Sequence, residues 1–125
     1  MKDDYIFIRG NVPSSKNSKQ WIGKHLINSK TVTKYLKEYE IQWITNKNKF
    51  IKMIKDKVTP YRIHFKFIRD SKRRFDYHNI VQLPCDLMTK HGWIQDDNAD
   101  NIIPIFEEYE YDKKNPGVYI WVEYP

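Results

Sequence analysis

Hydrophobic and polar residues alternate strictly between positions 61 and 67, directly after Thr59-Pro60. Aromatic and aliphatic side chains occupy the odd positions, and charged or polar side chains occupy the even ones. This period of two is typical of a β-strand with one buried face. Shorter runs of strand-forming residues predict further strands over residues 5–9, 102–111 and 118–124, with a turn over 112–117.

A period near 3.6 replaces this alternation between residues 31 and 57. Thr31 is a good N-cap, and the pattern predicts a long helix that ends near Asp56 or Lys57. The polar run 45–49 could divide this helix into two. One apolar stripe would face the core, formed by Val32, Tyr35, Leu36, Tyr39, Trp43, Phe50, Ile51 and Ile54.

A second helix is predicted over roughly residues 79–90. Pro84 falls within its first turns, where a missing N–H is tolerated best, and His91-Gly92 is a suitable helix stop. Trp93 follows the helix end and is expected in the core. Earlier in the chain, the polar composition of residues 12–20 predicts a loop, and residues 21–27 predict a small hairpin.

The order of these elements predicts an α+β fold, with a mixed β-sheet packed against two main helices. The chain has 125 residues, of which 40% are hydrophobic. This size and composition suit one domain with one core, so we expect a single domain over residues 1–125.

Several classes of protein are excluded by simple features of the chain. Cys85 is the only cysteine, so an intramolecular disulfide is impossible. The N-terminal residues lack the apolar stretch of a signal peptide, and no segment approaches the length of a membrane span. We therefore expect a soluble, cytoplasmic protein with no membrane partner.

The charge of the chain favours a polyanionic partner. Twenty-two Lys and Arg residues oppose 16 Asp and Glu residues, for a formal charge of +6 and a pI near 9.3. Such a balance favours nucleic acid, through phosphate contacts and counterion release, over a small-molecule substrate. Lys113 and Lys114 are expected to be exposed residues of a turn, without a binding role. The best candidates for phosphate contacts are Lys16, Lys19, Lys24, Lys72, Arg73 and Arg74.

Asp76, His78 and Asp97 carry the candidate chemistry. Asp76 and His78 are two residues apart, so in an extended segment their side chains would point to the same side. The helix that follows could return Asp97 to face them. Two carboxylates and an imidazole suit Mg²⁺ or Mn²⁺, and the imidazole favours Mn²⁺. Such an ion could polarise a scissile phosphate and lower the pKa of a bound water.

Neighbouring residues extend this hypothesis, and simpler interpretations stay open beside it. Asp96 is the second choice in place of Asp97, and Asn79 could cap the following helix while orienting His78. Alternatively, Asp96 and Asp97 could belong to a polar turn, Asp76 could be only an N-cap, and His78 could be an ordinary surface histidine.

Two blocks, residues 72–79 and 86–97, together resemble the RusA-type Holliday-junction resolvases, which are common in phages and prophages. The blocks read Lys-Arg-Arg-Phe-Asp-Tyr-His-Asn and Asp-Leu-Met-Thr-Lys-His-Gly-Trp-Ile-Gln-Asp-Asp. The family pattern is a basic run into Asp-x-Asp-Asn, a helix bearing a Lys and an Asp, and a Gly-aromatic stretch ending in Asp-Asp. Pro13-Ser14 and Asn17 also resemble the family's N-terminal Pro-Ser-Asn segment, so the resemblance covers nearly the whole chain.

The resemblance implies a homodimer that binds branched DNA and nicks four-way junctions symmetrically with Mg²⁺ or Mn²⁺, in recombination and repair. It implies that Asp76 and Asp97 are catalytic metal ligands with Asp96 beside them. Asn79 and Asp86 would support the site.

Two positions depart from the family pattern. His78 stands where the family has its second catalytic aspartate, which removes a negative charge from the metal site. Gln82 stands where it has a catalytic lysine, which removes a cation that could stabilise the transition state. The residues and the resemblance together make a metal-dependent endodeoxyribonuclease the leading hypothesis. The alternatives are a catalytically weak or inactive protein that binds branched DNA, and a basic partner of other replication or recombination proteins.

Overall fold

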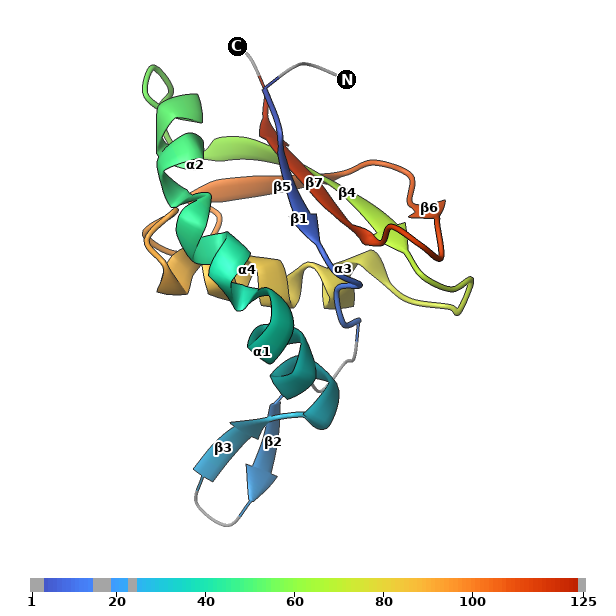
Figure 1. The fold of residues 1–125 in the computed structure, drawn as a ribbon. Helices are drawn as coiled ribbons and strands as arrows, with labels where there is room; N and C mark the ends of the chain where they lie inside the picture. The colour runs from blue at the N-terminus through green and yellow to red at the C-terminus, as the bar shows by residue number, and fades with distance from the viewer. Residues whose placement is uncertain (1–3, 15–18, 23–24, 124–125) are drawn as a thin grey trace.

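The fold is built on a mixed sheet of five strands. A computed structural model describes residues 4–14, 19–22 and 25–123, with residues 19–22 and 25–28 described as backbone only. Strand β7 (Gly117–Val122) runs antiparallel to both β1 (Ile6–Arg9) and β4 (Tyr61–Arg69). Two further strands, β5 (Ile102–Phe106) and β6 (Glu110–Tyr111), pair parallel with β4 (Figure 1). The predicted α+β fold with a mixed sheet is confirmed.

The alternation predicted for residues 61–67 is confirmed in β4. Ile63, Phe65 and Phe67 are fully buried, while His64 and Lys66 on the opposite face are half-buried. Strands β1 and β7 follow the same rule, because register pairs side chains of one face across neighbouring strands. The buried face of these two strands consists of Ile6, Ile8, Val118, Ile120 and Val122.

The predicted long helix is two helices, α1 (Lys30–Thr45) and α2 (Lys47–Met53), divided at Asn46 inside the predicted polar run. The N-cap is Ser29 rather than Thr31. Residue 29 directly follows a strand, keeps an extended backbone, and its hydroxyl accepts a hydrogen bond from the Val32 N–H at 3.3 Å. That bond satisfies one of the unpaired N–H groups of the first turn, so α1 begins before Thr31.

The helix predicted over residues 79–90 is also divided, into α3 (Tyr77–Ile80) and α4 (Gln82–Lys90). Pro84 explains the division, because it has no N–H to donate to Ile80 and its ring would clash with the carbonyl group of that residue. The predicted stop is confirmed: His91 is the C-cap of α4, and Gly92 has the positive φ of 76° that such a cap favours.

Two other predicted segments differ in detail from the structure. The predicted strand over 102–111 is interrupted at residues 107–109, so that β5 and β6 are separate. The predicted hairpin is present as β2 (Lys19–Ile22) and β3 (His25–Asn28), and it takes the last two residues of the predicted loop 12–20. In Figure 1 this hairpin projects away from the sheet beyond the start of α1.

Aromatic stacking joins the helices in the core. The Trp93 ring lies 5.1 Å from the Phe50 ring and 5.4 Å from the Trp43 ring. Its indole N–H donates to the Trp43 carbonyl at 2.7 Å, so its polar atom is satisfied inside the core. The prediction that Trp93 belongs to the core is confirmed. No helix in the described part of the chain is long and apolar enough to cross a membrane.

An ion-pair cluster on the surface ties α1 to the end of α4. One carboxylate oxygen of Glu40 accepts hydrogen bonds from Lys90 at 2.7 Å and from the His91 ring at 2.8 Å. The bond from Lys90, opposed in part by burial and helped by the bond from His91, lowers the pKa of the Glu40 carboxyl. A lowered pKa means that the folded state favours the ionised form of this group.

Glu40→Gln should therefore destabilise the protein near neutral pH and have little effect in acid. Since the pKa of Glu40 is lower in the folded state, its contribution exists above the ordinary pKa and is lost as the pH falls through the folded-state value. Thermal unfolding at about pH 7 and about pH 3 measures this difference. The exposed Glu108, which forms no ion pair within the described residues, provides the control: Glu108→Gln should match wild type at both pH values.

Candidate functional site

Asp76 lies where the loop after β4 enters α3. It occupies the N-cap position, with φ −111° and ψ 137°, and its backbone carbonyl accepts hydrogen bonds from the Asn79 and Ile80 N–H groups, both at 3.1 Å. Its side chain does not cap the helix. The carboxylate is exposed and accepts one hydrogen bond, from the Asn79 amide at 3.3 Å. Asp76 is therefore fixed through its backbone while its carboxylate faces solvent.

The aromatic neighbours of Asp76 anchor it to the sheet. Phe75 packs edge-on against Tyr109 at 5.0 Å, and Tyr77 stacks on Phe106 at 5.2 Å. The Tyr77 hydroxyl also accepts a hydrogen bond from the Tyr109 N–H at 3.0 Å. Two half-buried rings, one on each side of the aspartate, thus hold this segment against β5 and the chain that follows it.

Arg69, at the end of β4, supports the segment 75–77 through the ring of Phe75. Its guanidinium lies 4.8 Å from the centre of the Phe75 ring, donates to the Val12 carbonyl at 2.5 Å, and donates to the Ser14 hydroxyl at 3.4 Å. The side chain is 6% exposed, burial lowers its pKa, and its buried Nε has no hydrogen-bond partner among the described residues. Arg69 therefore links the Val12–Ser14 loop to the segment that carries Asp76.

Arg69 was not among the residues predicted for the site, although the sequence contains a signal for it. Position 69 continues the odd-numbered series that is buried along β4, so a charged residue there is out of pattern. A buried cation is costly unless polar groups surround it, and such residues concentrate at functional sites.

His78 lies inside α3, whereas its expected position beside Asp76 rested on an extended segment. Side chains two residues apart point to the same side only where the backbone is extended, so the structure removes that reason for placing the two together. The imidazole is exposed, and the His78 carbonyl accepts a hydrogen bond from the Gln82 amide at 3.3 Å. Asn79 is likewise not a cap: it is a buried residue within α3, and its amide points to Asp76.

Asp96 and Asp97 follow α4 in an exposed turn. The Asp97 N–H donates to the Asp96 carboxylate at 2.8 Å, and the Asn98 amide donates to the same carboxylate at 3.2 Å. The predicted alternative of a polar turn therefore describes Asp96 well. The carboxylate of Asp97 takes no part in these bonds and is left for other contacts.

A groove of about 410 Å³ runs between α1 and α4 beside this turn. Leucines from both helices line it, together with Asp86, Asp96 and Asp97. Cys85 lies beneath: burial raises its pKa to about 12, and the charges of Asp97 and Asp86 add to that effect. The groove thus brings Asp86 and Asp97 into one region, with Lys90 also on its lining.

The predicted three-ligand set is not assembled. Across residues 4–14, 19–22 and 25–123, no three His, Cys, Asp or Glu side chains lie close enough together to hold a metal ion. Asp76, His78 and Asp97 therefore do not form such a group.

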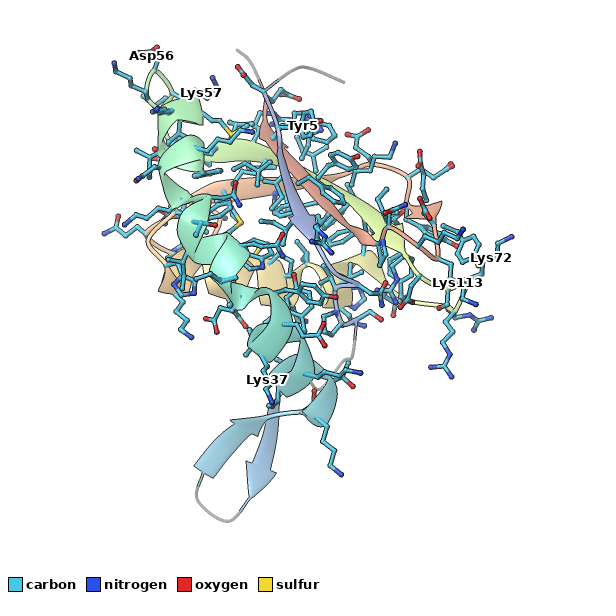
Figure 2. The ribbon with its side chains drawn as sticks, viewed as in Figure 1. Tyr5, Lys37, Asp56, Lys57, Lys72 and Lys113 are labelled. Atoms are coloured by element: carbon cyan, nitrogen blue, oxygen red, sulfur yellow. The ribbon has the colours of Figure 1, made fainter. Side chains whose placement is uncertain are left out.

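The predicted phosphate contacts after β4 lie in an exposed loop that leads to Asp76. Lys72, Arg73 and Arg74 are all exposed, and the Lys72 ammonium lies 5.4 Å from the centre of the Tyr111 ring. Figure 2 shows Lys72 at the outer edge of the molecule. Lys16 and Lys24 lie outside the described residues, as does the side chain of Lys19.

Comparison with known proteins gives one family. The family model described as Endodeoxyribonuclease RusA matches residues 11–123. The matched region includes the loop after β1, the Asp76 segment and the turn of Asp96 and Asp97. No curated protein matches the sequence.

Proposed function

Because this chain belongs to the RusA endodeoxyribonucleases, a family of Holliday-junction resolving enzymes, we propose that it is a divalent-metal-dependent endonuclease acting on four-way DNA junctions. The observation that supports this most is the Asp76 segment. Its exposed carboxylate lies between two anchored aromatic residues, and three exposed cations precede this segment in the chain. Such cations can bind the phosphate of the substrate, and a carboxylate held in place can bind a metal ion that activates the attacking water.

The metal ligands in this proposal are Asp76 and Asp97. Mg²⁺ is commonly bound by one or two carboxylates, with water and substrate phosphate completing its shell. A complete protein site is therefore unnecessary before DNA binds. The proposed metal dependence rests on the family and on these two exposed carboxylates.

A second function is favoured by the environment of His78 and Gln82. The His78 imidazole is exposed, and the Gln82 amide is engaged by a backbone carbonyl. Neither supplies the negative or positive charge that the family pattern has at these positions. The alternative is therefore a protein of the same fold that binds branched DNA and cuts it weakly or not at all.

We also propose that the protein acts as a homodimer in recombination or repair. A four-way junction has two equivalent strands to cut, and two identical sites related by two-fold symmetry would match it. Light scattering with and without junction DNA measures this. A monomer under both conditions at micromolar concentration would contradict the proposal.

Cleavage of a synthetic four-way junction tests the main proposal. Labelled junction and linear duplex are incubated with Mg²⁺, with Mn²⁺ and with a chelator. Cleavage that is specific for the junction and lost with the chelator supports the endonuclease. Binding without cleavage in either metal supports the alternative, and no binding at low salt contradicts both.

His78→Asp should raise Mg²⁺-dependent cleavage by about tenfold or more, since it restores a carboxylate that Mg²⁺ prefers to imidazole. His78→Asn has the size of aspartate without its charge, so it should give no increase. Initial cleavage rates at equal Mg²⁺ concentration measure both variants. Equal rates for the two variants would mean that the charge at position 78 does not act on the reaction.

A further inference from the structure

Two loops that are distant in sequence leave the sheet at the same place. The loop 70–76 follows β4, and the turn 112–116 follows β6. Because β6 pairs with the end of β4, Arg69 is in register with Tyr111, and the Asp112 N–H donates to the Arg69 carbonyl at 2.9 Å. Figure 2 shows Lys72 and Lys113 together at this edge of the molecule.

These two loops carry five exposed cations, which we name the basic tip: Lys72, Arg73, Arg74, Lys113 and Lys114. Within the described part of the chain, none of the five forms an ion pair. Arg62, Lys66 and Lys90 are each paired with a glutamate. Other exposed lysines, among them Lys52 and Lys55, also have no ion pair within the described residues, so what distinguishes the basic tip is that two loops bring five unpaired cations together. The basic tip thus keeps its positive charge free for an external anion.

The turn that carries Lys113 and Lys114 is braced on both sides. The Asp112 carboxylate accepts hydrogen bonds from the Lys114 and Asn115 N–H groups, at 3.0 and 3.3 Å. At its other end, the Pro116 carbonyl accepts from the Gly10 N–H at 2.9 Å. A braced turn holds its lysines at a fixed place beside the other loop, so less entropy is lost when they bind.

We infer that Lys113 and Lys114 bind the DNA backbone together with Lys72, Arg73 and Arg74, as one phosphate-binding surface. This inference rests on the proposed function, because it takes branched DNA as the ligand. The sequence pattern alone predicted only a place in a turn for these two lysines. The contacts are to phosphates, so they add affinity without sequence preference.

The position of the basic tip relates it to the site. Asp76 follows Arg74 by two residues, at most about 7 Å along the chain. A DNA strand whose phosphates bind the tip therefore passes close to the Asp76 carboxylate. The tip orients the strand, and the anchored segment presents the aspartate to it.

The test is the salt dependence of junction binding by Lys113→Gln/Lys114→Gln, measured in the presence of a chelator so that no cleavage occurs. Fluorescence anisotropy between about 50 and about 200 mM salt gives the slope of log K against log salt. If both lysines contact phosphates, the slope should become shallower by about two units. Arg73→Gln/Arg74→Gln should give a similar change.

The matched control is Lys52→Gln/Lys55→Gln, which removes the same charge from the region of α2. Figure 2 shows Asp56 and Lys57, the neighbours of Lys55, at the opposite side of the molecule from Lys72 and Lys113. This variant should keep the wild-type slope. The melting temperature of each variant should also stay at the wild-type value, because all four lysines are exposed.

The outcomes separate this inference from the proposed function. A Lys113→Gln/Lys114→Gln slope equal to that of the control overturns the inference, even if wild type cleaves junctions. A shallower slope with a wild type that cleaves nothing in Mg²⁺ or Mn²⁺ supports the inference and overturns the nuclease. A wild type that binds no junction at low salt overturns both.

Discussion

Replacing Asp76 with asparagine should lower junction cleavage by at least about 100-fold and leave junction binding unchanged. Loss of residues that only orient a metal ligand commonly costs 10- to 100-fold, so loss of a ligand itself should cost at least the upper value. Asparagine is equally suited to the N-cap position, and it can still pair with Asn79, so the segment should keep its structure. Single-turnover cleavage and anisotropy measure the two quantities.

The control for this loss comes from the exposed turn after α4, which carries Asp96 and Asp97. Asp97→Asn should reduce cleavage as Asp76→Asn does, whereas Asp100→Asn, an exposed neighbour in the same turn region, should cleave at the wild-type rate. If Asp76→Asn cleaves as fast as wild type, Asp76 is not catalytic. If all three variants lose activity equally, the effect is one of net negative charge and not of particular ligands.

The largest loss of stability is expected from Trp93→Ala, at about 3–5 kcal/mol of unfolding free energy. This side chain is 2% exposed, stacks on Phe50, packs at a tilt against Trp43, and fills the space where α1, α2 and the end of α4 meet. Its removal leaves a cavity and also leaves the Trp43 carbonyl without the indole donor. Equilibrium unfolding in urea measures the change.

Trp121→Ala is the matched control, because it removes the same side chain from the open face of the sheet. There Trp121 is half-buried and stacks on His64 at 5.0 Å. Its loss should cost clearly less than that of Trp93. Equal losses would show that the open face contributes to stability as much as the core does.

The parts of the fold that follow from local pattern could be predicted from the sequence. The alternation along β4 fixed which residues are buried, and the polar run 45–49 marked the division of the first long helix. The second division does not follow from the place of Pro84 within the first turns of the predicted helix. The effect of this proline falls on the carbonyl group of Ile80, four residues earlier.

The residues proposed for the candidate site stand out in the sequence, but their arrangement in space does not follow from it. The basic loop, Asp76 and the acidic turn stand in the sequence as a recognisable series, and the family match includes them. The expectation that Asp76 and His78 point to the same side requires residue 78 to be extended, but residue 78 lies in the short helix α3. Arg69 and the basic tip depend on contacts between residues distant in sequence, which no local pattern contains.

The buried thiol of Cys85 allows local opening of this protein to be followed by its rate of alkylation. With its pKa raised to about 12 and its side chain buried, Cys85 has very little thiolate to react near neutral pH. An alkylating reagent can therefore modify it only when α4 opens, and there is no second cysteine to obscure the signal. Asp86 and Asp97 line the groove above this thiol. The rate of alkylation therefore reports how often α4 opens beside these two aspartates. Any ligand that holds the turn of Asp96 and Asp97 against α4 would slow the alkylation of Cys85, whether or not DNA is cut.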